Sequence, residues 1–285
     1  MEESKRKDFS VSSAGSPTKP LTQTVRRHGR NMLENYLKLG DSLFEIRYVE
    51  DDLRYAQKTF AILSKALSSV TDYFLVSEPF PKVRVVLVPD RNEFDRLVVN
   101  FLRVEIEIPS NPARIAQPQR TDMVLLSPSA YESHSVFKYI PYQFRRLLIH
   151  ELVHMVEEYL SPNIEASPRW WSEGLAVYLS EQWRHEDEFR KAALDGIAEN
   201  KIPGFRQIEA ERNLAYDWGW TIVRFIEICY GKEMILRIVK ECADGNVFSV
   251  IGDDAEGIEK MWKDWLLGEG RLTSQSSGRD STPRC

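Results

Sequence analysis

The sequence of 285 residues has only three cysteines, and none of them lies close to another. A cysteine-ligated zinc site and a disulfide framework both need closely spaced cysteines, so neither is indicated. No stretch approaches the roughly 18 consecutive apolar residues that identify a membrane-spanning helix. The positive charges near the N-terminus precede no apolar segment, so no secretory signal is predicted and a cytoplasmic location is expected.

The sequence also lacks a strong excess of either charge. The formal net charge is −5, which provides no general attraction to nucleic acid or to an anionic membrane, so neither is an expected partner. With 42% apolar and 28% charged residues, the chain has the composition of an ordinary globular protein and is long enough to bury a sizeable core. Nothing in the composition indicates an oligomeric state.

Three segments differ in composition. Residues 1–40 are polar and weakly periodic, which predicts a flexible tail that runs into an irregular or helical lead-in. Residues 269–285 have the polar, Ser-, Gly- and Arg-rich composition of a disordered tail. Residues 41–268 contain no internal repeat and are expected to form one folded domain.

The order of the predicted elements indicates an α+β fold. Strands are expected at 43–48, 82–88, 101–108 and 121–127, and helices at 52–73 and from the N-cap Asp90 to about residue 100. After Pro141 nearly every segment up to residue 267 is predicted to be helical. Strands come first and most helices later, which favours a small mixed sheet with a helical C-terminal half over a regular βαβ alternation.

The predicted helix at 145–160 contains His150, Glu151 and His154 in the pattern H-E-x-x-H. Residues four apart lie one above the other on a helix, so the two imidazoles can bind one metal ion. Glu151 lies about 100° further around the helix axis and can reach a water beside that ion. The alternative is an amphipathic helix with two partly buried histidines.

A second segment, PRWWSEGLAVYLSE, favours the metal site. Glu173 lies 19 positions after His154 in an unusually apolar neighbourhood, where a carboxylate needs a partner. Two histidines and one glutamate leave the fourth zinc position to water, which is typical of catalytic rather than structural zinc.

The two motifs together resemble those of the gluzincin zinc metallopeptidases, in which the third ligand lies on a following helix. The segment from Trp170 to Tyr178 is similar to the W-x-x-E-G-x-A-x-Y motif of the M1 aminopeptidase branch, and small peptidase MA-like domains are more similar still. They share segments that resemble KVRVVLVPDRNEFDRL, AYDWGWTIVRFIEICYG and IEKMWKDWL. The resemblance implies a thermolysin-like architecture with a central zinc-binding helix, and a catalytic domain over residues 41–268.

The resemblance implies that His150, His154 and Glu173 hold Zn²⁺ while Glu151 acts as general base in peptide hydrolysis. A tyrosine or a histidine stabilises the oxyanion in similar enzymes, and Tyr216 matches the place of such a tyrosine. A core tyrosine is the alternative for Tyr216.

Three further expectations concern the surroundings of the site. In similar peptidases the strand before the zinc helix is an edge strand that binds extended substrate, which implies a substrate-binding role for Met123 and Leu125. The alternative is a plain structural strand. Glu157 and Glu158 are expected to be exposed to solvent. The alternative is that one of them orients a metal-binding histidine by a hydrogen bond to its ring.

The sequence departs from the M1 aminopeptidases at two points. It has no Gly-x-Met-Glu-Asn segment before the zinc helix, which in that branch recognises the substrate amino terminus, and Ser172 stands where that branch usually has asparagine. An endopeptidase acting on a peptide or protein substrate is therefore expected. Two alternatives remain: a metal-binding module that is non-proteolytic or inhibited by residues 1–40, and a helical protein with a fortuitous motif.

Overall fold

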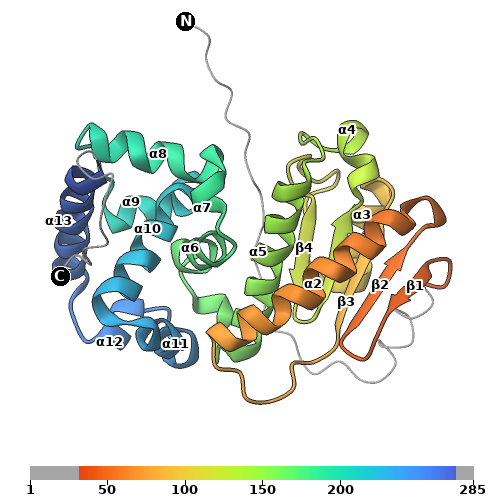
Figure 1. Cartoon of the computed structure of the whole chain (residues 1–285), viewed down its shortest axis with the longest axis horizontal. Helices are drawn as coiled ribbons and strands as arrows, with labels where there is room; N and C mark the ends of the chain where they lie inside the picture. The colour runs from red at the N-terminus through yellow and green to blue at the C-terminus, as the bar shows by residue number, and fades with distance from the viewer. Residues whose placement is uncertain (1–31, 274–285) are drawn as a thin grey trace, which may run out of the picture. The chain divides into compact units, whose positions relative to one another are not determined.

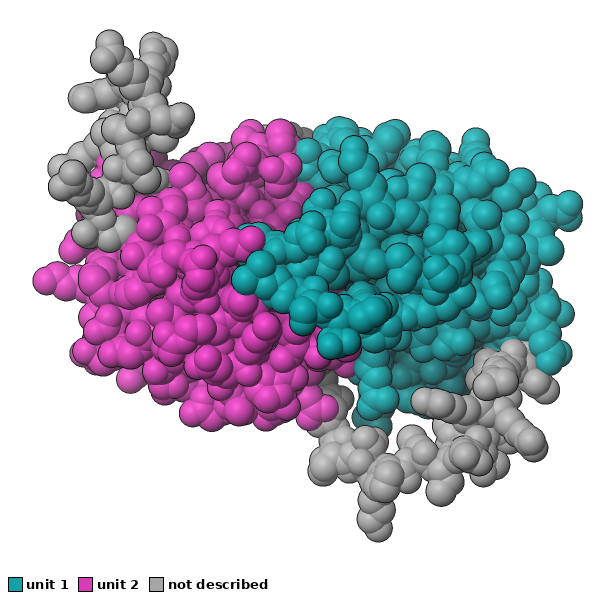
Figure 2. Space-filling model, turned by 60° about the horizontal axis from the view of Figure 1, so that its bottom comes forward, with its two compact units in different colours: residues 1–155 teal, residues 156–285 magenta. Residues whose placement is uncertain are grey.

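The computed structural model describes residues 32–273 (Figure 1), so most of the predicted tails, residues 1–31 and 274–285, lie outside the described residues. Two compact units are distinguished, residues 1–155 and 156–285 (Figure 2). The boundary between them falls inside one continuous helix, α5 (Pro141–Leu160).

The first unit is built on a five-stranded mixed sheet with the order β1-β2-β3-β5-β4. The strands are β1 (Leu37–Gly40), β2 (Phe44–Tyr48), β3 (Val83–Val88), β4 (Ala116–Gln119) and β5 (Asp122–Leu126). The pairs β2–β3 and β3–β5 are parallel, and the pairs β1–β2 and β4–β5 are antiparallel. β1 occupies part of the segment for which the sequence predicted an irregular or helical lead-in.

The central strand β3 is the most buried part of the described sheet. The run VRVVLV is buried along its length except for the half-buried Arg84, which pairs with Asp122 of β5. A strand that is buried on both faces is expected to have a nearly continuous apolar sequence, and β3 has one. β2 instead alternates buried and half-buried residues. The strands predicted at 43–48, 82–88 and 121–127 are confirmed.

Helices connect and cover the strands of this unit (Figure 1). The described helical elements are η1 (Glu50–Asp52), α2 (Leu53–Tyr73), α3 (Arg91–Leu97), η2 (Val98–Leu102), η3 (Pro128–Ala130), α4 (Tyr131–His134) and the start of α5. The Asp90 side chain accepts a hydrogen bond of 2.9 Å from the backbone N–H of Glu93, which confirms the predicted N-cap. α2 packs on β1 and β2, and α3 packs on β3 and β5.

The strand predicted at 101–108 is wrong. Residues 98–102 continue α3 as a π-helical turn, which ends at Arg103 in the left-handed backbone region (φ 66°). The alternating pattern of 101–108 resembles one face of a strand, but no neighbouring strand pairs with it. The fourth strand of the sheet is instead β4, which follows a loop that the buried Arg91 holds by donating to the carbonyls of Pro112 and Arg114.

The second unit is helical throughout its described residues. Its elements are the end of α5, η4 (Ile164–Ala166), α6 (Arg169–Leu179), α7 (Gln182–His185), α8 (Asp187–Ala198), α9 (Phe205–Ala210), α10 (Arg212–Tyr230), α11 (Lys232–Glu241), α12 (Val247–Ile251) and α13 (Ala255–Thr273). The predicted α+β class, with a small mixed sheet followed by a helical C-terminal half, is confirmed. None of the helices within residues 32–273 combines the length and the apolar character needed to cross a membrane.

The core of the second unit forms around α10, which packs against α6, α8, α9 and α11 (Figure 1). Its contact with α6 is unusually close, because Gly174 of α6 faces Gly219 of α10. A Cβ atom at Gly174 would overlap the backbone of Gly219, and one at Gly219 would overlap the carbonyl oxygen of Trp170. Only glycine at both positions permits this approach.

We expect the substitution Gly174→Ala to destabilise the protein by about 1–3 kcal/mol, because the added methyl group forces the two helices apart. The matched substitution is Gly268→Ala on α13, where no neighbouring atom lies within 4 Å of the added Cβ. It should stabilise the protein by about 0.5–1 kcal/mol through helix propensity. The midpoints of urea denaturation measure both changes. A Gly174→Ala variant as stable as the wild type would contradict the close packing of α6 on α10.

Candidate metal centre

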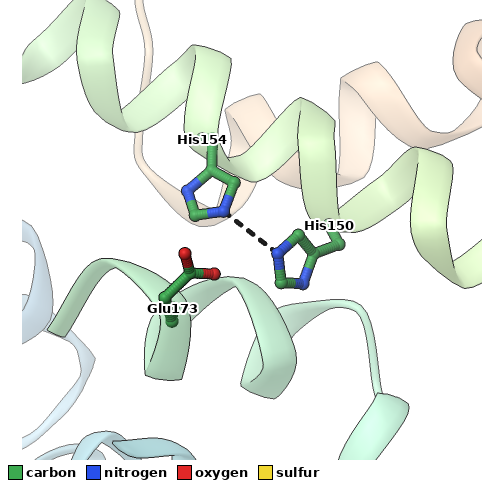
Figure 3. Close-up of side chains that lie close together, drawn as sticks. All are labelled: His150, His154 and Glu173. Carbon is green, nitrogen blue, oxygen red and sulfur yellow. Dashed lines mark hydrogen bonds between the residues drawn. The ribbon is translucent and has the colours of Figure 1, made fainter. Parts of the chain in front are cut away.

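His150 and His154 lie one turn apart on α5 with their rings turned toward each other (Figure 3). Their ring centroids are 4.7 Å apart and their Nε2 atoms are 3.0 Å apart. His150 is buried and His154 is half-buried. The helix packs through its apolar side, where Leu148, Leu152 and Met155 are fully buried.

Glu173, near the middle of α6, brings a carboxylate to the two imidazoles (Figure 3). One ligand atom from each of the three residues lies within 4.8 Å of the other two. Within the described part of the chain, no other group of three or more histidine, cysteine, aspartate or glutamate side chains forms such a cluster. The structure thus brings together the three residues that the sequence singled out as metal ligands.

The donor set fits a catalytic zinc ion. Two nitrogens bound at about 2.0–2.1 Å to one tetrahedral ion lie about 3.3–3.4 Å apart, close to the 3.0 Å between the two Nε2 atoms. Glu173 is only 6% exposed, and a buried carboxylate facing two imidazole nitrogens is favourable when a cation lies between them. Three protein ligands leave the fourth position open.

Glu151, the predicted general base, follows His150 on α5 and is buried at 4% exposure. Tyr131, at the start of α4, lies near enough for the charge of Glu151 to act on it. Burial raises the pKa of the Tyr131 phenol, and the nearby Tyr139 and Glu151 raise it further, so the phenol remains protonated.

A hydrogen bond fixes the segment that precedes Glu173. The Ser172 hydroxyl donates to Glu157 Oε1 at 3.0 Å. Glu157 lies three residues after His154, so the bond links the end of α5 to the residue before Glu173. Glu157 is only 1% exposed, and the expectation that it faces solvent is therefore wrong for this residue. Glu158 is half-buried.

With this geometry in place, the family assignment rests on sequence. The family model of the Peptidase MA superfamily matches residues 138–268, which include α5, α6 and all three clustered residues. The prediction of a peptidase MA-like domain is confirmed for this segment, and the N-terminal boundary predicted at residue 41 stays a prediction.

Solved structures of M1 zinc metallopeptidases also align with the chain. A two-domain M1 zinc metallopeptidase bound to L-arginine aligns with 16% identity and a TM-score of 0.41, covering 87% of this chain and 53% of that chain. An M1 zinc metallopeptidase from Deinococcus radiodurans aligns with 16% identity and a TM-score of 0.41, covering 87% and 52%. This chain therefore spans about half the length of these proteins. No curated protein matches it.

Tyr216 is buried on α10, where its ring lies 6.4 Å from that of Phe189. It precedes Gly219 by one helical turn and so lies near the side of α10 that packs on α6. Its role at the oxyanion stays a prediction. Tyr178 of α6 has a structural role, since its hydroxyl donates to Glu227 and its ring stacks on Trp183.

The predicted substrate-binding role of Met123 and Leu125 is corrected. β5 is not an edge strand, because it pairs with β3 on one side and with β4 on the other. Both side chains are fully buried at 0% exposure and therefore belong to the core. The sequence could not reveal this arrangement, because the short segment AQPQ that forms the edge strand β4 has no strand-like pattern.

Sequence reasoning missed one polar residue on the metal-binding helix. Arg146 is buried on α5, four residues before His150. The spacing of four was available in the sequence, but an arginine beside the exposed Arg145 is usually solvated. Arg146 stands out because the structure buries it, and its spacing from His150 alone did not single it out.

We expect Ser172→Ala to destabilise the Peptidase MA domain by about 1–3 kcal/mol, because the substitution removes a donor from a buried carboxyl group. The free energy of unfolding from urea denaturation measures the loss. As a matched control, Ser68→Ala on the exposed face of α2 should change stability by less than about 0.5 kcal/mol. Equal effects of the two substitutions would show that the bond between Ser172 and Glu157 contributes nothing.

Proposed function

We propose that this protein is a zinc-dependent endopeptidase. The observation that carries the proposal is the cluster of His150, His154 and Glu173, whose ligand atoms lie within 4.8 Å of one another beside the buried Glu151. The match of residues 138–268 to the Peptidase MA superfamily supports the same conclusion from sequence.

In this proposal the imidazoles of His150 and His154 and the carboxylate of Glu173 hold the metal. Zinc at such a site lowers the pKa of water to about 7 and polarises the carbonyl of the peptide bond that is cut. Burial of His150 and Glu173 restricts the rotation of both side chains, so the ligands are positioned before the metal binds.

Glu151 serves as the general base. It follows His150 directly, so it projects about 100° around α5 from the ligand stripe. Its carboxylate accepts the proton of the attacking water and passes it to the nitrogen of the leaving amine. The low exposure of Glu151 strengthens its interactions with charges that develop in the transition state.

Tyr216 is proposed to donate a hydrogen bond to the oxyanion. Its support is its place on α10, one turn from the contact of Gly219 with Gly174, the residue that follows Glu173. A phenol donates to an oxyanion without giving up its proton in the ground state, which suits a tyrosine held in a buried position.

The endopeptidase assignment rests on what precedes α5. Aminopeptidases of the M1 branch recognise the substrate amino terminus with a Gly-x-Met-Glu-Asn segment, and the sequence from Pro128 to Ile140 contains none. Without that segment, a free amino terminus has no dedicated partner before the zinc helix, and cleavage within a peptide is favoured.

The purified protein should bind one equivalent of zinc, and His150→Ala or Glu173→Ala should weaken binding at least about 100-fold, because each removes one of three ligands. Metal analysis after dialysis and competition with a chromogenic chelator measure the loss. The exposed His185→Ala serves as the matched control and should retain the metal. Unchanged zinc affinity in both ligand variants would refute the metal site.

Glu151→Gln should abolish peptide hydrolysis, lowering kcat by at least about 100-fold while zinc remains bound, because the amide cannot accept the proton of water. Turnover of a fluorogenic peptide library, with metal analysis of the same samples, measures both quantities. The control Glu165→Gln, an exposed residue between α5 and α6, should keep full activity.

A zinc-loaded wild-type protein that cleaves no member of the library would refute the peptidase function and leave the metal site intact. A Glu151→Gln variant with wild-type kcat would retain the peptidase function but assign the general base elsewhere.

A further inference from the structure

A buried arginine lies on the same side of α5 as the two metal-binding histidines. Arg146 precedes His150 by four residues, and residues at this spacing lie one above the other on a helix. It exposes only 9% of its surface. The neighbouring Arg145, by contrast, is exposed to solvent. Arg146 therefore occupies an environment that an arginine seldom enters without a partner.

Arg146 forms no ion pair and no hydrogen bond with any residue in the described range 32–273, and its Nε atom is buried without an acceptor. The contact that it does make is with the ring of Tyr142, whose centroid lies 5.4 Å from the guanidinium carbon. Tyr142 is one turn nearer to the start of α5 and is 50% exposed. The guanidinium thus leans along the helix, away from His150 and toward an exposed ring.

The burial of a guanidinium whose Nε has no acceptor is unfavourable, and a contact with an aromatic ring compensates only part of the loss. A guanidinium presents a planar fork of donors that matches both oxygens of a carboxylate. The described chain provides no such carboxylate to Arg146. The missing partner is therefore best supplied by a bound molecule that carries one.

We propose that Arg146 binds a carboxylate of the peptide substrate and thereby gives the enzyme a preference for acidic peptides. This inference rests on the proposed peptidase function. The carboxylate can belong to an aspartate or glutamate side chain or to the C-terminus of the substrate, and both offer the same two oxygens to the guanidinium.

The position of the carboxylate follows from helix geometry. The midpoint between His150 and His154 lies six residues after Arg146 and ten residues after Tyr142. These spacings correspond to about 9–15 Å along the axis of α5. The proposal places the extended peptide along α5, where it advances about 3.3 Å per residue. The carboxylate should therefore lie about three to four residues from the bond that is cut.

The test uses decapeptides of one neutral sequence in which a single glutamine is replaced by glutamate, position by position. Each peptide is made with a free and with an amidated C-terminus. For the wild type, glutamate at one position about three to four residues from the cleaved bond, or a free C-terminus at that distance, should lower KM by about 10- to 100-fold. The kcat values should change little, because the contact lies away from the reacting atoms.

Arg146→Met should remove this preference while leaving the turnover of neutral peptides unchanged, and Arg145→Met should keep it. Arg146→Lys should retain only part of it, because an ammonium group cannot bind both oxygens in one plane. An Arg146→Met variant that still prefers the acidic peptide, or that slows neutral and acidic peptides equally, would overturn the proposal.

Thermal unfolding without peptide separates this role from a structural one. A buried arginine without a bound carboxylate destabilises the folded protein. Arg146→Met should therefore unfold at the same temperature as the wild type or at a higher one. A lower unfolding temperature would show that Arg146 is paired within the protein and would count against the proposal.

Binding separates the failure of this proposal from the failure of the proposed function. Fluorescence anisotropy with zinc-loaded Glu151→Gln protein gives the dissociation constants of labelled acidic and neutral peptides without hydrolysis. If the wild type cleaves no peptide, the peptidase function fails, and the binding measurement still decides on Arg146. A preference for acidic peptides that disappears in the Glu151→Gln, Arg146→Met double variant supports the site, and equal affinities refute it.

Discussion

The position of Glu173 depends on the close approach of α6 to α10. The two helices meet at Gly174 and Gly219, where neither backbone leaves room for a side chain. Because Gly174 follows Glu173 directly, this contact fixes both the depth and the rotation of α6 at Glu173. The hydrogen bond from Ser172 to Glu157 holds the residue on the other side of Glu173. The backbone that carries the Glu173 carboxylate is therefore held at both neighbouring residues.

Local periodicity was sufficient to predict three of the five strands and the longest helix of the first unit. The strands β2, β3 and β5, the long helix α2 and the N-cap Asp90 are encoded within a few residues of sequence, and each was found where it was expected. The approach of His150 to His154 was predictable for a related reason, since a spacing of four on a helix has a direct geometric meaning. The partner of a segment is not encoded in this way. Residues 101–108 alternate like a strand but have no neighbouring strand to pair with. β5 is an inner strand because β4, whose sequence has no strand-like pattern, forms the edge of the sheet beside it.

Burial of polar side chains was the property least accessible from sequence. Glu157 and Arg146 both looked like solvated residues of an amphipathic helix, yet they expose only 1% and 9% of their surfaces. A charge or carboxyl group is usually placed on the outside by composition alone, and only tertiary packing shows when this rule fails. The two exceptions lie on the same stripe of α5 as the histidines. A helix that buries its polar stripe and its apolar side alike loses stability, which is typical of elements shaped by function rather than by folding.

The pairing of Ser172 with Glu157 gives physical meaning to a departure from the M1 pattern. Where that branch usually has asparagine, which offers both a donor and an acceptor, this chain has a hydroxyl whose donated hydrogen bond is directed to a buried carboxyl group. Glu157 is in turn placed by α5, three residues after His154. The change at residue 172 and the acidic residue at 157 therefore act together, and replacing only one of them would leave a buried polar group without its hydrogen bond. This coupling explains how Glu173 can stay in place while the residue before it differs.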